Sequence, residues 1–424
     1  MDVFWIVLSA FSVWLVITII SLYFFIQYRH EPTIQHRSVS LTCLFALFNS
    51  VLIGYLLYKL ARPITSCIAR LWIPSLVFPL LVLTILGKLI RLIFLGRYHK
   101  SIYLEAKLES ITEEIECGYG IELSEESFMG AQRNMNIKET WYCKYRHLFT
   151  TSRIIETLSA FLLLHLGITA VVNTISPMSP ALIPGGECLM GWEYYPFIGS
   201  LIIYLFLGVP VLLYWFWGID DVYGIRKELI SVGIISMVGF FLYLVFWFLP
   251  SLRVVEKTFA AYVWGAITLV LIHILFVIYP IYELRKSRQA RANAKNTQVF
   301  DQILSDPILF EDFKAFTIKD FSVENPLFYE RCKKLRTSHT SNTRLPGKNL
   351  TNKTRNELNS MFQTFINPKS EFQVNLSSAT IQELTRQFES GELSLNMFAR
   401  AEWEIHLLMY QNTFPRYLRY TSLI

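Results

Sequence analysis

Charged residues are scarce in this sequence. Asp, Glu, Lys and Arg make up 17% of the 424 residues, whereas they make up about 25% of a typical soluble globular protein. Hydrophobic residues, in turn, reach 53%. This balance excludes an ordinary soluble protein as the class of the whole chain. The net charge of +6 is modest and clusters beside hydrophobic runs, so we expect an anionic lipid surface as a partner and no nucleic acid.

Cysteine is also scarce and scattered. The six cysteines are Cys43, Cys67, Cys117, Cys143, Cys188 and Cys332. No two of them have the Cys-x-x-Cys spacing, and no His/Cys cluster has the spacing of zinc ligands. The pattern excludes a disulfide-stapled scaffold and predicts neither a metal site nor a cofactor.

Seven apolar stretches are about 18 residues long or longer, the length that spans a bilayer. They cover residues 3–27, 38–58, 71–87, 157–174, 195–218, 230–249 and 258–282. Each is expected to be a helix, because lipid offers no partner to a free backbone amide. The third is expected to continue past Lys88 and Arg91, since residues 92–96 are apolar again. The first has no basic segment before it, which predicts a retained helix and not a cleaved signal peptide.

Basic residues beside the spans predict the orientation. With the N-terminus outside, the short inner segments hold Arg29, Arg37, Arg226, Lys227, Arg285, Lys286, Arg288, Arg291 and Lys295. The outer loops hold Arg62, Arg70, Arg253 and Lys257, and the long outer loop 175–194 holds none. This asymmetry favours a multi-pass plasma-membrane protein with an extracellular N-terminus and a cytoplasmic C-terminus. The long inner loop, 97–153, is either a helical extension of the third span or a solvated acidic loop.

The chain after residue 282 is predicted to be a soluble helical domain. Leu358, Met361, Phe362, Phe365 and Ile366 follow the spacing of one helix face. Other faces carry Phe328, Cys332 and Leu335; Ile381, Leu384 and Phe388, with Ser378 as N-cap and Gly391 as stop; and Phe398, Ala401, Ile405 and Leu408. No stretch has the alternation of a strand.

The fold class is therefore all-α, with a seven-helix transmembrane bundle followed by a soluble all-helical domain. We place the membrane region at 1–282, a basic juxtamembrane linker at 283–297 and the soluble domain at 298–422. About 120 residues are enough for one independent core.

Four strings of the soluble domain carry a family resemblance. They are FDQILSDPILFEDFKAF (300–316), FSVENPLFYERCKKL (321–335), FINPKSEFQVNL (365–376) and FARAEWEIHLLMYQNTFPRYLRY (398–420). In this order and spacing they resemble the regulator-of-G-protein-signalling (RGS) domain. With its seven spans, the whole chain is similar to the seven-transmembrane RGS proteins of plants and fungi.

The resemblance implies a GTPase activator that binds the switch regions of a GTP-bound Gα subunit. Such a domain stabilises the form that Gα takes at the transition state, and only such differential binding raises the rate. Because Gα carries its own arginine finger and its own glutamine, the resemblance implies no catalytic residue and no cofactor in this chain.

The family motifs imply seven Gα-contact residues. They are Ser322, Glu324 and Asn325 in the Ser-x-Glu-Asn turn, Asn375 in Val-Asn-Leu, and Leu408, Asn412 and Arg416 in the closing helix. Position 412 is usually Asp in the family, so Asn412 lacks a charge that would strengthen its hydrogen bonds. Taken without the resemblance, Glu324, Asn325 and Asn375 are equally typical of helix caps, and Leu408 of a core.

The membrane half resembles a G-protein-coupled receptor less closely. Arg97-Tyr98 follows Gly96 where receptors have an acid, and Tyr279-Pro280-Ile281-Tyr282 is only loosely like the receptor ending. Under the predicted topology Cys67 and Cys188 face outside, where receptors have a disulfide, so the resemblance implies this pair. The alternative is two unpaired thiols.

Three hypotheses remain for the spans. They transmit control by an extracellular small-molecule ligand to the GTPase activator, they only anchor it, or they form a transporter or channel with an appended regulatory domain. His165 and His273 are the polar candidates within the spans, either as functional groups or as neutral side chains bonded to neighbouring helices.

Overall fold

The computed structural model describes residues 3–61, 67–116, 144–176, 191–217, 219–248, 261–293, 297–340, 352–368, 370 and 372–421. Within these residues every regular element is a helix, which confirms the predicted all-α class. The chain divides into two compact units. The first comprises Met1–Phe94, His147–Ile219 and Tyr223–Lys286, and the second comprises Leu95–Arg146, Asp220–Val222 and Ser287–Ile424. The domain boundaries at 282 and 297 stay predictions.

In the described part of the chain, seven helices are long and apolar enough to cross a membrane. They are α1 (Val3–Gln27), α3 (Val39–Ala61), α4 (Cys67–Glu116), α6 (Thr151–Ile175), the run of α7 (Tyr195–Ile202), η3 (Ile203–Gly208) and α8 (Val209–Phe216), α9 (Ile225–Phe248), and the run of α11 (Ala261–His273), η5 (Ile274–Ile278) and α12 (Tyr279–Asn293). The seven predicted spans are thereby confirmed as helices. Because α4 continues to Glu116, the helical extension of the third span is also confirmed up to that residue.

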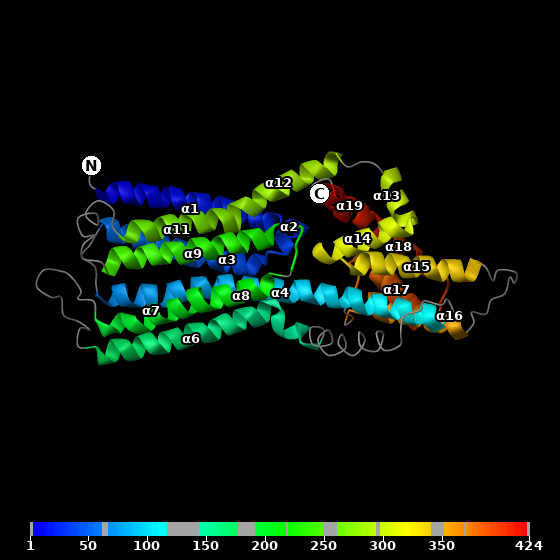
Figure 1. Cartoon of the computed structure of the whole chain (residues 1–424), viewed down its shortest axis with the longest axis horizontal. Coiled ribbons are helices and arrows are strands. Elements are labelled where there is room, and N and C mark those ends of the chain that lie inside the picture. The colour runs from blue at the N-terminus through cyan, green and yellow to red at the C-terminus, as the bar shows by residue number, and fades with distance from the viewer. Residues whose placement is uncertain are drawn as a thin grey trace, which may run out of the picture. The chain divides into compact units, whose positions relative to one another are not determined.

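The first unit is a bundle in which α1 packs on α3, α3 on α11, and α11 on α9 (Figure 1). Of the seven helices, α4 has the most buried apolar segment, 72% of which is buried in the structure. A core cluster joins α3, α4, η3 and α9 through Leu41, Val82, Leu205 and Phe240. Large apolar side chains such as Ile19 remain exposed, as lipid-facing residues would be.

Each π-helical segment in the described residues ends two residues before a proline. The pairs are η3 and Pro210, η5 and Pro280, η6 (Phe362–Ile366) and Pro368, and η7 (Met409–Thr413) and Pro415. Proline has no N–H for the carbonyl four residues earlier, and its ring clashes with that carbonyl. After η3, η5 and η7 the helix continues through the proline, whereas after η6 it ends at Asn367.

The second unit contains a set of shorter helices. They are α13 (Thr297–Ser305), α14 (Pro307–Lys319), α15 (Glu324–Thr340), α16 (Asn352–Met361), η6, α17 (Ser378–Glu389), α18 (Ala399–Leu408), η7 and α19 (Phe414–Thr421). Their apolar faces meet in one core cluster that includes Phe300, Phe313, Phe328, Leu358, Phe365, Ile405 and Phe414. The faces predicted from spacing therefore form a single core, except that Leu408 is only half-buried and is not part of this cluster.

Local capping explains where these helices begin and end. Asp306 precedes Pro307, and its Oδ1 accepts from the N–H of Ile308 at 2.8 Å, as expected of an N-cap followed by proline. The N-cap of α17 is Ser377 and not Ser378, so that prediction was wrong by one residue. Gly391 follows α17 with φ +72°, which confirms it as the helix stop.

Candidate functional site

The turn between α14 and α15 carries the first predicted contact residues. Helix α14 ends at Lys319, and Phe321 adopts the left-handed conformation with φ +52°. A non-glycine residue there costs on the order of 1 kcal/mol. The turn is held by the Ser322 N–H, which donates to the Thr317 carbonyl at 3.0 Å, and by the burial of Phe321, which is 4% exposed.

Asp320 joins two predicted contact residues that are far apart in sequence. Its carboxylate is fully buried and accepts from Ser322 Oγ at 2.9 Å. Arg416 donates to the same carboxylate through Nε and Nη2, both at 2.6 Å. This bidentate ion pair ties the turn to the last helix of the domain.

Sequence reasoning missed Asp320. A signal was present, because an acidic residue at the C-terminal end of a helix opposes the helix dipole and therefore needs a compensating partner. That partner, Arg416, lies 96 residues further along the chain, and no local pattern reveals it.

Glu324 and Asn325 begin α15 and are shielded from solvent. The Glu324 side chain is 18% exposed, and Asn325 is 2% exposed. Burial, helped by the charge of Asp320, raises the pKa of Glu324 to about 8 against an opposing backbone hydrogen bond. Asn325 Nδ2 donates to Glu324 Oε1 at 3.4 Å, whereas Asn325 Oδ1 has no hydrogen-bond partner among the described atoms. An unpaired buried acceptor costs about 1–3 kcal/mol.

Part of the shielding comes from the extension of α4, which belongs to the same unit. The ring of His99 lies 5.7 Å from the ring of Phe321, and His99 Nδ1 lies 3.9 Å from Glu324 Oε2. This distance is a contact and not a hydrogen bond. One turn later, Tyr103 donates to Glu311 Oε2 at 3.5 Å. Nothing in the sequence singled out His99.

The segment Asp220–Val222 also belongs to this unit and reaches the end of α14. The Val222 N–H donates to the Lys319 carbonyl at 3.3 Å, and Lys319 Nζ lies 3.5 Å from Asp220 Oδ2. The same ammonium donates to Tyr420 Oη at 2.7 Å. Two segments that adjoin predicted spans therefore contact the helix that leads into the turn.

Asn375 differs from the turn residues because it is exposed. Its neighbours Val374 and Leu376 are buried in the core, and the Val374 N–H donates to the Phe365 carbonyl at 2.9 Å. This alternation directs Asn375 outward from an anchored backbone. Ser377 caps the following helix, so Asn375 is not its cap.

The remaining predicted contacts lie near the end of the domain. Leu408 and Asn412 are half-buried, at the end of α18 and in η7, and Arg416 is 8% exposed because of its pairing with Asp320. The predicted disulfide between Cys67 and Cys188 lies outside what the structure describes, since neither the Cys67 side chain nor Cys188 is among the described parts.

The two histidines of the spans bond to side chains of other helices. His165 Nε2 lies 3.2 Å from Tyr204 Oη, and His273 Nε2 lies 3.3 Å from Ser21 Oγ. The ring of His273 also packs edge-on against Trp14, with centroids 4.8 Å apart. These contacts favour a packing role for both histidines.

Two family models match the chain. Residues 299–422 match the model described as the regulator of G protein signaling domain. Residues 1–112 match the model described as the 7 transmembrane sweet-taste receptor of 3 GCPR. The first match includes all seven predicted contact residues.

The chain is also similar, over about a third of its length, to curated proteins. Regulator of G-protein signaling 8 of Macaca fascicularis is 28% identical over 139 residues, which are 32% of this chain and 65% of the relative. The proteins of the same name from Rattus norvegicus and Homo sapiens are 32% and 29% identical over 120 residues, which are 28% of this chain and 60% of each relative. The chain thus spans less than two thirds of the length of these relatives.

Proposed function

We propose, from the premise that residues 299–422 form an RGS domain in a chain with seven membrane-spanning helices, that this protein accelerates GTP hydrolysis by a Gα subunit at a membrane. The domain would bind Gα in its transition-state conformation. It would supply no acid, base or nucleophile of its own, because Gα already carries the arginine finger and the water-orienting glutamine. Binding that is tighter in the transition state than in the ground state is sufficient to raise the rate.

The observation that carries this proposal is the exposed amide of Asn375 on an anchored backbone. Val374 and Leu376 fix the segment in the core on either side of it. An amide donates and accepts at once, so Asn375 can hydrogen-bond a Gα glutamine and a switch residue together. Because the backbone is already fixed, little ordering entropy opposes this contact.

The shielded turn offers a second contact of a different kind. Asn325 Oδ1 is a buried acceptor without a hydrogen-bond partner among the described atoms. Such an atom gains a hydrogen bond whenever a partner protein supplies a donor. We therefore assign Ser322, Glu324 and Asn325 to the same Gα surface, although this turn must become more accessible first.

In this role the RGS domain would lie in the cytoplasm, beside the plasma membrane. The basic residues of the predicted inner segments support this orientation, and the basic stretch 283–297 would contact anionic lipid. Helix α4 supports control by an extracellular small-molecule ligand. This single helix, Cys67–Glu116, contains residues of the apolar bundle and also His99, which contacts the turn. A passive anchor is the competing role for the spans.

Single-turnover GTP hydrolysis tests the proposed activity. The full chain in lipid nanodiscs and the fragment 297–424 are each added to a GTP-loaded Gα subunit, as wild type and as Asn375→Ala. We expect acceleration by the wild type and a loss of about tenfold or more in the variant. Asn396→Ala removes an equally exposed amide elsewhere in the domain and should leave the rate unchanged. The proposal is contradicted if neither the full chain nor the fragment accelerates GTP hydrolysis. It is also contradicted if Asn375→Ala and Asn396→Ala accelerate hydrolysis equally.

A further inference from the structure

A pocket in the first unit lies beside α6 and is also lined by α4, η2 (Trp192–Tyr194), α7 and η3. Its cavity volume is about 80 Å³, which accommodates a molecule of about five or six non-hydrogen atoms. Much of its wall is apolar and includes Leu71, Val172 and Phe197. The polar side chains that line it are those of Ser75, His165, Thr169, Glu193, Ser200 and Tyr204.

Glu193 places a buried carboxylate in the wall of this pocket. It is 7% exposed, and its Oε1 accepts from Ser176 Oγ at 2.8 Å, whereas its Oε2 has no hydrogen-bond partner among the described atoms. Gly191 leaves room for the carboxylate, because a Cβ at that position would overlap Oε2. No lysine or arginine is among the described residues that line the pocket. The carboxylate is therefore held in place, but this wall supplies no lysine or arginine to balance its charge.

His165 does not supply the missing cation. Ser176, the C-cap of α6 that donates to Glu193, follows His165 by 11 residues, which is about 16 Å along a helix axis. His165 Nε2 is instead paired with Tyr204 Oη at 3.2 Å. The histidine and the carboxylate thus belong to different ends of the pocket.

Two hydroxyls of the wall present acceptors to the pocket. Thr169 Oγ1 donates to the His165 carbonyl at 2.7 Å, and Ser200 Oγ donates to the Phe197 carbonyl at 2.8 Å. Because each hydroxyl uses its only proton within its own helix, it offers lone pairs to a ligand. The acceptors of the pocket therefore favour a ligand that donates hydrogen bonds.

We propose that this pocket binds a small primary ammonium with a short apolar body. A buried carboxylate without a cation or a proton is costly in a region of low dielectric. An ammonium balances this charge and has three N–H donors, which suit the Glu193 carboxylate and the acceptor hydroxyls. The apolar side chains of Leu71, Val172 and Phe197 suit a hydrocarbon body, and the volume limits that body to about four carbons.

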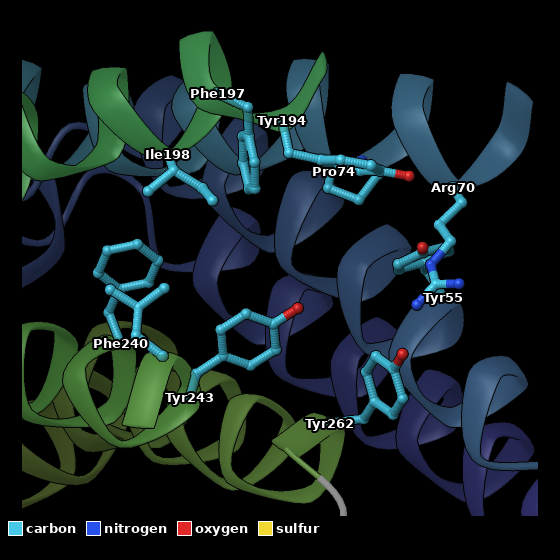
Figure 2. A pocket seen from close by; sticks show the side chains of 10 residues that line it. Tyr55, Arg70, Pro74, Tyr194, Phe197, Ile198, Phe240, Tyr243 and Tyr262 are labelled. Carbon is cyan, nitrogen blue, oxygen red and sulfur yellow. The ribbon is translucent and has the colours of Figure 1, made fainter. Parts of the chain in front are cut away.

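The same residues disfavour other ligand classes. A carboxylate ligand would be repelled by Glu193, and a neutral alcohol would leave its charge unbalanced. A sodium ion would balance the charge but would leave the apolar wall uncovered. Figure 2 shows the neighbouring pocket of this unit, whose lining also includes Phe197 but contains Arg70 and not Glu193. A substitution at Glu193 therefore tests the first pocket and not the one in Figure 2.

The test uses the full chain in phosphatidylcholine nanodiscs and three probes of similar length, butylammonium chloride, butanol and sodium butyrate, with sodium chloride as the salt control. Affinity is measured from the rise of the thermal unfolding midpoint with probe concentration. We expect butylammonium to bind about tenfold or more tightly than the other probes. Glu193→Gln keeps the shape of the side chain but removes its charge, so it should lose this preference, and its response also measures any effect of the probes on the lipid.

Two further variants make this test specific. Gly191→Ala should lower the butylammonium affinity several-fold, because the added Cβ displaces the carboxylate, whereas the φ of −117° at this position suits alanine. It still decides if Glu193→Gln does not fold. Glu156→Gln is the matched control, since Glu156 is an exposed carboxylate of α6 outside the pocket, and it should bind butylammonium as the wild type does.

A primary ammonium can be a free amine or the headgroup of an aminophospholipid. Leu164 and Ile168 also line the pocket and are 53% and 38% exposed, so lipid can approach it from the side. Repeating the titration in nanodiscs that contain phosphatidylethanolamine distinguishes the two sources. A bound headgroup would compete and lower the apparent affinity for butylammonium several-fold, whereas an unchanged affinity assigns the site to free amines.

Binding is measured without any G protein, so its failure is distinguishable from failure of the proposed GTPase activation. Three outcomes would overturn the inference. They are equal affinity for butylammonium and butanol, a rise of the midpoint with sodium chloride as large as that with butylammonium chloride, and a butylammonium affinity that neither Glu193→Gln nor Gly191→Ala lowers.

Discussion

The two parts of the proposed Gα surface differ in how they meet solvent. Asn375 is exposed and is held by its buried neighbours. The turn from Ser322 to Asn325 is shielded by His99, linked through Asp320 to Arg416, and contains a buried acceptor without a described partner. One part is ready for a partner, whereas the other is shielded and has most of its polar groups, but not Asn325 Oδ1, engaged within the second unit.

This difference indicates that residues of one family motif can have two different roles. A residue can occupy a motif position because it touches the partner or because it fixes the backbone that does so. The exposed amide of Asn375 fits the first role. Arg416, which is mostly buried in a bidentate ion pair, fits the second role better, and Ser322 shares its acceptor. Substitutions in both parts of the surface test this division, and the one with the greatest expected effect is at Asp320.

Removal of the Asp320 carboxylate should destabilise the RGS domain most. Asp320→Ala leaves the buried Arg416 guanidinium without its bidentate partner and frees Ser322. Breaking a buried ion pair from one side costs about 3–5 kcal/mol. Urea unfolding of the fragment 297–424 measures this loss, and Asp312→Ala, which removes an exposed carboxylate of the same helix, is the control. A loss below about 1 kcal/mol would assign Arg416 to the partner-contacting group.

The shielded carboxyl of Glu324 should make stability depend on pH. Burial raises its pKa from 4.5 to about 8, so the folded state holds the proton more tightly than the unfolded state does. The contribution of Glu324 to the free energy of unfolding is therefore fully present below pH 4.5. It is lost as the pH rises toward 8, with a slope of at most about 1.4 kcal/mol per pH unit. Thermal unfolding of the full chain between pH 5 and 9 should show this decline, and Glu324→Gln should flatten it.

Comparison with the fragment 297–424 makes that test sharper. The fragment lacks His99, which covers part of Glu324 in the full chain. The decline with pH should consequently be weaker in the fragment than in the full chain. An equally steep decline in both would mean that α15 and its own neighbours bury the carboxyl without help from α4.

Exposure of the turn should improve binding to Gα. His99→Ala removes the ring that packs on Phe321 and approaches Glu324, so the full chain should bind Gα a few-fold more tightly, on the order of 1 kcal/mol. The affinity is measured for Gα in its transition-state form, with the full chain in nanodiscs. His147→Ala, which removes an exposed histidine, is the control. An unchanged affinity would mean that His99 does not obstruct the turn.

The sequence predicted the parts of this molecule that depend on local pattern. Hydrophobic length determined the spans, and the spacing of Leu358, Phe362 and Phe365 determined a core face. The sequence pattern did not predict that Asp320 and His99 lie beside the site. Asp320 matters because it pairs with Arg416, 96 residues further along the chain. His99 matters because α4 reaches Phe321 and Glu324. Neither partner can be identified from the local pattern of a single sequence.

The smallest effect is expected at Asn412, which is half-buried in η7. The RGS family usually has Asp at this position, and a carboxylate accepts from backbone amides of a partner more strongly than an amide oxygen does. Asn412→Asp should therefore raise the acceleration of GTP hydrolysis about two- to fivefold, which corresponds to roughly 0.5–1 kcal/mol. Gln411→Glu adds the same charge at the neighbouring exposed position. If both variants gain equally, long-range attraction to Gα explains the gain; a gain in Asn412→Asp alone assigns position 412 to the exposed, partner-contacting group with Asn375.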